Sequence, residues 1–446
     1  MKAIEDLGIC MPEILLPAGK NMMSWPVIAC DQYTQDKTYW QKLSEITSGK
    51  PSTLNLILPE IYLENNKEER ISKIRQTMRE YLENGVFQPP QKCFVYIERT
   101  TPFNRIRKGL IALIDLEKYE WKPLSKANIR ATEKTIVERI PPRIAIRKGA
   151  PLELPHIMLL ADDKSRQLVE KTGDLVRNKP PLYQIDLMCG GGSVKGWSVS
   201  TDSEVSNVTS AITKLATEKT APDGSIFLFA VGDGNHSLAT AKAVWDDYKK
   251  ELKEQGIPDD QIAQNPVRWA LVEIVNMYDE GLTFEPIHRV VFGADSRTLI
   301  SDILKKLGGK VTTLNSATSL QEAVKKSTSS FGFAFNENGA KKFELLEAEI
   351  DSLAVSVLQP ALDEALDEIA KRDPNGKRPI IDYIHGSDEL VKLGERLGAT
   401  AILLPPVSKD SFFETINHRG SLPNKSFSMG EADEKRFYLE CRRLFP

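Results

Sequence analysis

The stretch Ile226-Phe-Leu-Phe-Ala-Val-Gly-Asp-Gly-Asn-His-Ser-Leu-Ala-Thr-Ala-Lys242 indicates the fold class of this chain. Its first six residues, 226–231, are apolar and predict a buried strand. Gly232 and Gly234 then allow a tight turn with positive φ and a close approach of backbone. The apolar side chains of the predicted helix that follows face inward: Leu238, Ala239, Ala241 and Val244. A strand that passes through a glycine turn into an amphipathic helix is typical of a protein with both helices and sheets.

Short β-type runs alternate with helical stretches on both sides of this motif. The predicted strands include 27–30, 54–58, 93–97, 109–116, 183–187, 196–200 and 269–275. The predicted helices include 36–46, 67–82, 204–218 and 237–254. The fold class is therefore α/β (mixed α+β).

A change of pattern near residues 293–296 suggests a boundary between domains. We predict a main α/β domain at 1–294, a smaller α/β lobe at 295–378 and a C-terminal strand–helix segment at 379–446. The last segment is expected to pack back on the main domain. A chain of 446 residues is long enough for such an arrangement.

The composition is that of an ordinary globular protein, with 41% hydrophobic and 27% charged residues. A net charge of −3 gives no global attraction to nucleic acid or to anionic lipid, so neither is expected as a partner. The apolar runs are too short for a membrane span. The five cysteines are scattered and never form a C-x-x-C pair, which favours reduced thiols and a cytoplasmic location.

The glycine turn has the features of an anion site. Free N–H groups at a helix start, together with the helix dipole, favour a phosphate or carboxylate. Asn235 or Ser237 is expected to cap the helix. Asp233 supplies a metal ligand or a base, and His236 supplies a hydrogen-bond donor. The alternative is a generic tight turn with a surface aspartate and histidine.

Four other segments carry polar groups that suit a charged ligand. The segment 129–143 is rich in cations, hydroxyls and carboxylates, and its alternative interpretation is a solvated helix. His288 and Arg289 stand at the mouth of a predicted strand, and Lys425 and Ser426 lie in a loop. Polar residues 31–34 follow the first strand, where open α/β sheets place ligands.

These segments together resemble the bacterial and archaeal family catalogued as domain of unknown function 1015. The matching pieces keep the family's order along the chain: 29–34, 130–135, 142–143, 183–187, 232–239, 287–289 and 422–430. The family's core motif is similar to that of the ParB/sulfiredoxin-like superfamily, above all the free serine kinases. The resemblance implies a ParB/sulfiredoxin-like core with large insertions and a smaller additional α/β lobe.

The resemblance also implies site residues. Asp233 matches the aspartate of the kinase motif, Glu133 matches the upstream glutamate, and His236 matches the second histidine. This chain departs from the pattern with Asn235 for the first histidine, Ser237 for the arginine and Thr132 for the histidine before the glutamate. The missing arginine removes a bidentate phosphate ligand, which leaves room for a donor such as pyrophosphate.

We therefore expect a small-molecule phosphotransferase, in particular a free L-serine kinase that makes O-phospho-L-serine from ATP, ADP or pyrophosphate, or runs in reverse. Asp233 would bind Mg²⁺ or orient the acceptor, Glu133 would act as general base, and His236 would offset transition-state charge. The expected phosphate-binding residues are Gly232, Gly234, Asn235, Ser237, Lys425 and Ser426. The expected substrate-binding residues are Arg130, Thr132, Thr135, Arg143, His288 and Arg289.

Three alternatives stay open at this point. The same groups could hydrolyse phosphoserine, since water can replace the acceptor. The chain could instead be a ParB-like nucleotide switch or DNA-binding adaptor, or a non-catalytic metabolite-binding protein.

Overall fold

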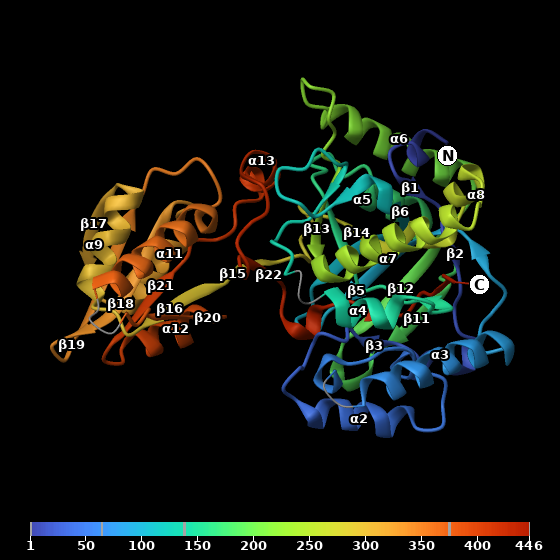
Figure 1. Ribbon diagram of the computed structural model, residues 1–446, viewed down its shortest axis with the longest axis horizontal. Helices are drawn as coiled ribbons and strands as arrows, with labels where there is room; N and C mark the ends of the chain where they lie inside the picture. The colour runs from blue at the N-terminus through green and yellow to red at the C-terminus, as the bar shows by residue number, and fades with distance from the viewer. Residues whose placement is uncertain (1, 64–65, 137–139, 373–375, 446) are drawn as a thin grey trace. The chain divides into compact units, whose positions relative to one another are not determined.

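The computed structural model describes residues 2–63, 66–136, 140–372 and 376–445 (Figure 1). The chain forms two compact units. The first contains residues 1–282 and 430–446, and the second contains residues 283–429. Both combine helices and sheets, which confirms the predicted mixed α/β class. No helix in the described part of the chain is long and apolar enough to cross a membrane.

A mixed ten-stranded sheet forms the centre of the first unit. Its strand order is β11-β12-β5-β6-β14-β10-β13-β8-β7, and β1 adds to β6. The β10–β14, β13–β8 and β7–β8 pairs are parallel and the others antiparallel. The strands are β1 (Ile9–Cys10), β5 (Phe94–Thr100), β6 (Ile106–Asp115), β7 (Tyr119–Glu120), β8 (Ile129–Arg130), β10 (Met158–Ala161), β11 (Tyr183–Asp186), β12 (Ser193–Val199), β13 (Phe229–Asp233) and β14 (Trp269–Asn276).

Both faces of this sheet are buried, which explains the continuous apolar runs of β5 and β6. Phe94, Tyr96 and Leu110 point into one core, which is shared with the helices α5 (Val169–Val176), α6 (Asp202–Glu218) and α7 (Asn235–Glu254). Val95 and Ile111 point into a second core, shared with α2 (Lys37–Thr47) and α3 (Lys67–Glu83). In Figure 1, α2 and α3 lie on the opposite side of the first unit from α5 and α6.

The second unit is built on a six-stranded antiparallel sheet with the order β17-β19-β18-β21-β16-β20. Its strands are β16 (His288–Phe292), β17 (Lys310–Leu314), β18 (Ser330–Glu337), β19 (Ala340–Glu347), β20 (Ile380–Ile384) and β21 (Ala399–Leu403). Its helices are α9 (Ser296–Leu307), α10 (Ala317–Lys325), α11 (Ala354–Arg372), α12 (Ser387–Gly394) and α13 (Lys409–Arg419). A short antiparallel pair, β15 (Phe284–Pro286) with β22 (Phe427–Met429), joins its two ends.

The domain boundaries differ from the predicted 1–294, 295–378 and 379–446. Strands β20 and β21 pair with β16 by backbone hydrogen bonds, so residues 379–429 belong to the second unit. Only residues 430–446 return to the first unit. These pairings are between strands about a hundred residues apart, which the local sequence pattern does not specify.

Two elements differ locally from their prediction. The run 54–58 was predicted as a strand, but 53–56 form a 3₁₀ turn, η2 (Thr53–Leu56), because the Ser52 hydroxyl accepts a hydrogen bond from the Leu54 N–H at 3.2 Å. The strand predicted at 226–231 lies at 229–233 as β13. Its pairing with β10 begins at Phe229 and continues through Asp233, so Gly232 lies inside the strand.

Residues 430–446, which we call the C-terminal segment, are fixed to the first unit by buried charges. The Arg436 guanidinium donates to Glu273 Oε2 at 2.8 Å and to Glu440 Oε2 at 2.6 Å. Arg107 Nε bonds the other Glu273 oxygen at 3.2 Å. Burial alone would raise the pKa of Glu273, but Arg107 and Arg436 outweigh it and hold that pKa below its ordinary value. Farther along the segment, Arg442 pairs with Glu153.

Replacement of Arg436 with alanine is expected to destabilise the first unit by about 3–5 kcal/mol, because Glu273 and Glu440 would keep buried charge without their shared cation. All six tryptophans lie in the first unit, so urea unfolding followed by tryptophan fluorescence reports that unit. The matched control is Arg443→Ala, at an exposed position, which should change the unfolding free energy by less than about 0.5 kcal/mol. Equal effects of the two substitutions would contradict this role of Arg436.

Acid is expected to weaken the same unit. The pKa of Glu273 and of Glu153 is lowered in the folded chain, where neighbouring arginines outweigh the effect of burial. Each carboxylate therefore contributes stability above its unfolded pKa of about 4.3, and this stability is lost as the pH falls through the folded pKa. The unfolding free energy from urea titrations should decrease steadily below about pH 4.3. A constant value down to pH 3 would exclude these carboxylates as ionised pairs.

Candidate functional site

The site is built where β13 ends and α7 begins. Gly234 adopts φ +83° between them, and a Cβ at this position would come within 3.1 Å of Ile157. A side chain is therefore disfavoured both by conformation and by space. The Gly234 N–H donates to Asp233 Oδ1 at 2.9 Å, and α7 starts at Asn235. The first N–H groups of this 20-residue helix point out of its end, as in any α-helix.

Asn235 does not cap the helix as predicted, because its side chain is turned toward the segment before α4 (Ile140–Arg147). Asn235 Oδ1 accepts from the Thr132 N–H at 3.1 Å, and Asn235 Nδ2 donates to Thr132 Oγ1 at 3.2 Å. Thr132 Oγ1 donates in turn to the Val231 carbonyl at 2.6 Å. Two of the residues that depart from the resembled kinase pattern thus bond to each other. This buried pair holds residue 132 against the start of the helix.

His236 holds the other end of the same segment. Its Nε2 accepts from the Ile136 N–H at 3.3 Å. Glu133 therefore lies in a short stretch that is anchored at residues 132 and 136 to the first turn of α7, and its side chain is half-buried. The structure brings the segment of Glu133 to the helix start that follows Asp233, as the prediction for a common site requires.

A lysine from the C-terminal segment reaches Asp233. Lys435 Nζ lies 3.3 Å from Asp233 Oδ2. The same lysine acts on Asp31, which follows β3 (Val27–Ile28). Burial would raise the pKa of Asp31, but His156, Gln32 and Lys435 outweigh it and hold the pKa below its ordinary value. The Lys435 ammonium thus pairs with Asp233 and also helps to stabilise the negative charge of Asp31.

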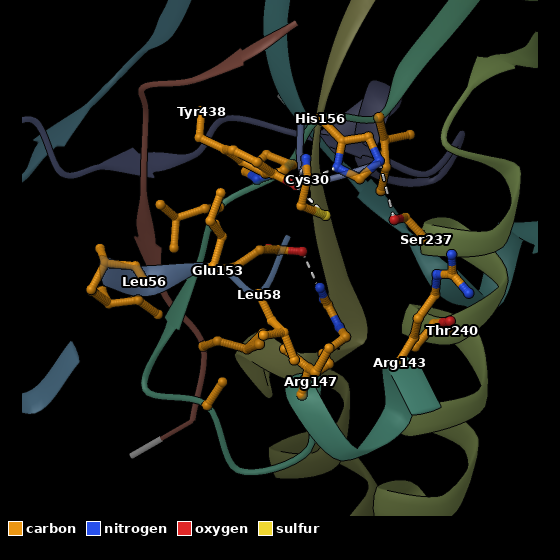
Figure 2. A pocket seen from close by; sticks show the side chains of 18 of the residues that line it. Cys30, Leu56, Leu58, Arg143, Arg147, Glu153, His156, Ser237, Thr240 and Tyr438 are labelled. Atoms are coloured by element: carbon orange, nitrogen blue, oxygen red, sulfur yellow. Dashed lines mark hydrogen bonds and ion pairs between the residues drawn. The ribbon is translucent and has the colours of Figure 1, made fainter. Parts of the chain in front are cut away.

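His156 is close to Asp31 and is itself buried, between Tyr438 and Ser237 in Figure 2. Its Nε2 stands 3.7 Å from Asp31 Oδ2 and 3.4 Å from Ser237 Oγ. Its Nδ1 is 2.8 Å from the Tyr438 hydroxyl, which also contacts Cys30 Sγ at 3.1 Å. Burial, followed by the nearby Asp31 carboxylate, raises the pKa of Cys30 to about 12, so the thiol is neutral. The cluster joins four separate parts of the sequence.

This cluster lines one end of a cavity of about 150 Å³ within the first unit (Figure 2). The walls are mostly aliphatic, and the polar groups lie around His156 and Arg143. Arg143 is paired with Glu60, and Arg147 Nη2 is paired with Glu153 Oε1 at 2.6 Å. The aliphatic lining residues include Leu56, Leu58, Met78, Ile146, Leu152, Leu154, Ile157 and Leu444.

Two of the predicted substrate-binding residues lie in buried surroundings. Arg130 donates through Nε to the Ala127 carbonyl at 2.8 Å, and its guanidinium lies 4.3 Å from the centre of the Phe227 ring. Its pKa is lowered by burial. Thr135 is buried, and its hydroxyl forms no hydrogen bond with the described residues. Arg130 therefore contributes to packing, which its position in a charged stretch of sequence did not indicate.

Four further predicted residues belong to the second unit. His288 accepts from the Leu404 N–H at 3.1 Å, and burial lowers its pKa to about 4. Arg289 is fully buried, with its Nε bonded to Gln359 Oε1 at 3.0 Å. Ser426 is buried and donates to the Pro423 carbonyl, whereas Lys425 is exposed at φ +60°. The contacts of His288, Arg289 and Ser426 serve the packing of their own unit.

The donors for a metal ion are few. Among residues 2–63, 66–136, 140–372 and 376–445, no group of three or more histidine, cysteine, aspartate or glutamate side chains could hold one. Asp233 offers its carboxylate, and Lys435 stands where a cation would approach it. The described residues therefore do not form a resident Mg²⁺ site.

Four residues near the start of α7 were not among the predicted site residues: Asp31, His156, Lys435 and Tyr438. Asp31 had a signal, since residues 31–34 follow a strand at the edge where ligands bind. His156 was isolated among apolar residues, and Lys435 and Tyr438 lie some 200 residues beyond Asp233. Only the path of the C-terminal segment brings these two side chains to the site.

Replacement of Lys435 with methionine is expected to raise the pKa of Asp31, because it removes one of the positive charges that keep this carboxylate ionised. Carboxyl ¹³C NMR during a pH titration measures this change directly. The matched control is Lys250→Met, at an exposed position far along α7, which should leave the Asp31 titration unchanged. An unchanged Asp31 titration in Lys435→Met would contradict the shared ammonium.

Comparisons with known proteins agree with the family resemblance. The sequence matches the family described as "Protein of unknown function (DUF1015)" over residues 13–365. The predicted loop at Lys425 lies beyond this match. No curated protein matches the chain.

Three solved structures are similar to parts of the fold. A free serine kinase in complex with AMP is 13% identical, with 75% of this chain and 91% of that chain covered and a TM-score of 0.34. A conserved hypothetical protein from Pyrococcus furiosus is 13% identical, with 75% and 95% covered and a TM-score of 0.34. C-terminally truncated SbnI from Staphylococcus aureus is 10% identical, with 72% and 82% covered and a TM-score of 0.32. Because the family match spans well over half of the sequence, this chain belongs to the DUF1015 family of proteins of unknown function.

Proposed function

We propose that this protein is a small-molecule phosphotransferase that moves a phosphoryl group between a nucleotide or pyrophosphate and the hydroxyl of a small acceptor. The acceptor implied by the family resemblance is L-serine, with O-phospho-L-serine as product. The observation that carries the proposal is the start of α7. There the helix N–H groups, the Asp233–Lys435 pair and the His156 cluster meet beside a cavity.

The start of α7 suits the transferred group. Backbone N–H groups and the helix dipole stabilise a phosphate without any side-chain rearrangement. Gly234 adopts the positive φ that turns the chain from β13 into α7, so the helix begins at Asn235 directly after the strand. Lys435 supplies the mobile positive charge that phosphoryl transfer needs as charge spreads over the phosphate oxygens.

The acceptor would bind in the cavity. Arg143 lines it and supplies a cation for the carboxylate of an amino acid, in exchange for its present partner Glu60. Asp233 would orient the acceptor, and Glu133 is the general base that the resemblance implies. His236 would stabilise the segment of Glu133, since its Nε2 already holds the Ile136 N–H.

Mg²⁺ enters this proposal only with the donor. Magnesium keeps several waters and commonly binds through one or two carboxylates together with substrate phosphates. Among the described residues at the start of α7, Asp233 offers a carboxylate that is already paired with Lys435. We propose that the ion is carried by the nucleotide or pyrophosphate.

Phosphorus NMR tests the proposed reaction. The full-length protein with Mg²⁺ and L-serine, and ATP, ADP or pyrophosphate in separate samples, should produce a phosphoserine signal with one donor. Asp233→Asn should lower that rate by at least about 100-fold, because the acceptor loses its orienting carboxylate. The matched control is Asp246→Asn, at an exposed position on the same helix, which should keep the wild-type rate.

Samples that contain the protein and O-phosphoserine without a donor distinguish the proposed phosphotransferase from a phosphoserine phosphatase. Release of inorganic phosphate from this compound, without transfer from any donor, would make the protein a phosphoserine phosphatase. Absence of any change in every sample would reject the proposed reaction with serine.

A further inference from the structure

The imidazole of His156 is held in a fixed orientation in the wall of the cavity. His156 lies just before β10 and is 6% exposed. Figure 2 shows its ring between Tyr438 on one side and Ser237 on the other. A histidine whose two ring nitrogens face different partners has a defined proton arrangement, and this arrangement decides whether it acts as an acid or a base.

The hydrogen bonds of Tyr438 assign that arrangement. A phenol has one proton to donate. The Tyr438 hydroxyl donates to Cys30 Sγ at 3.1 Å and accepts from the Cys30 N–H at 3.3 Å. In this arrangement its remaining partner, His156 Nδ1 at 2.8 Å, is the donor. With the proton on Nδ1, the lone pair of Nε2 is directed toward Ser237 Oγ.

A carboxylate lies close to the imidazole ring of His156. Asp31 Oδ2 lies 3.7 Å from Nε2 and is ionised, because His156, Gln32 and Lys435 outweigh burial and lower its pKa. Burial, followed by the charges of Cys30 and Asp31, raises the pKa of Tyr438 well above its ordinary value, so the phenol is neutral.

Other charged groups face the ring less directly. The Cys30 thiol is also neutral, as its raised pKa shows. Arg143 lines the same cavity and is paired with Glu60, and Lys435 acts on Asp31. A carboxylate is thus the nearest charge to Nε2, and it would stabilise an imidazolium.

The contact with Ser237 leaves room for a ligand. At 3.4 Å it is at the long end of hydrogen-bond distances. A hydroxyl group that enters from the cavity would approach Nε2 along the same direction. The phosphate site at the start of α7 is close by, since Ser237 belongs to the first turn of that helix. The hydroxyl and the phosphoryl group would meet at this turn.

We infer that His156, in place of the Glu133 that the family resemblance implies, is the general base of this site and removes the proton from the acceptor hydroxyl. This role rests on the proposed phosphotransferase function. As the acceptor oxygen forms its bond to phosphorus, its O–H bond breaks and the proton passes to Nε2. The bond between phosphorus and the leaving phosphate of the nucleotide or pyrophosphate breaks, and that phosphate takes the electron pair. Asp31 stabilises the imidazolium until it loses its proton to water.

The test compares the pH dependence of turnover in variants. His156→Asn places an amide N–H near the position of Nδ1, so the bond to Tyr438 is kept while the base is lost. The phosphorus NMR rate should fall about 100- to 10,000-fold, with the KM for the donor changed less than about threefold. In the wild type, turnover should rise with pH as the imidazole loses its proton, and this rise should be absent in His156→Asn. The matched control is His418→Asn, at an exposed position in the second unit.

The outcomes separate this inference from the proposed function. Turnover by the wild type that survives in His156→Asn, with the same pH profile, would overturn the role of His156 and leave the phosphotransferase in place. If Glu133→Gln rather than His156→Asn removes the rise with pH, Glu133 is the base. No turnover by the wild type would reject the reaction itself. Ring ¹⁵N NMR of the wild type provides a second readout, because a proton on Nε2 instead of Nδ1 would contradict the assigned arrangement without any assay of turnover.

Discussion

The buried carboxylate of Glu273 is the constraint on which the first unit depends. It sits in the middle of the ten-stranded sheet, fully buried, and is neutralised by Arg107 from the neighbouring strand and by Arg436 from the C-terminal segment. A buried charge of this kind is tolerated only with its partners in place. The chain must therefore bring residue 436 back to the sheet after 147 residues of a separate unit. The need for charge compensation thus fixes the path of the last seventeen residues.

The path of the C-terminal segment also places two of its side chains in the candidate site. Lys435 and Tyr438 flank the residues that anchor the segment, so the contacts of Arg436 with Glu273 and with the Pro155 carbonyl set the positions of both side chains. Pro155 precedes His156 directly, and Arg436 therefore holds the backbone of two parts of the cluster at once. The Arg436 guanidinium therefore both stabilises the first unit and positions side chains of the candidate site. A substitution that loosens the segment would displace the ammonium beside Asp233 and the phenol beside His156 together.

The local parts of the structure were predictable and the long-range parts were not. The helices α3 and α7 and the strands β5, β6 and β14 follow from apolar periodicity, and the glycine turn at Gly234 follows from the backbone conformation that it requires. The boundary of the second unit depends on pairing of β16 with β20 and β21, which no local pattern specifies. Arg130, His288 and Arg289 carry charges that looked available for a ligand. Their burial shows that the presence of a polar residue in the sequence does not indicate whether its side chain faces a ligand, the solvent or the protein core.

The departures of this chain from the resembled kinase motif form a consistent set. Thr132 and Asn235 replace two histidines and bond to each other, so this part of the site is closed by neutral hydrogen bonds. Ser237 replaces an arginine, and a short hydroxyl there leaves space for the imidazole of His156 to face the helix start. A site that gives up a fixed arginine needs another cation for phosphate, and Lys435 stands beside Asp233 to supply it. Because a lysine is a compact charge on a flexible stem, in the proposed reaction it would follow a phosphoryl group as it moves and would not hold it in one geometry. The proposed chemistry thus depends on the C-terminal segment as much as on the glycine motif.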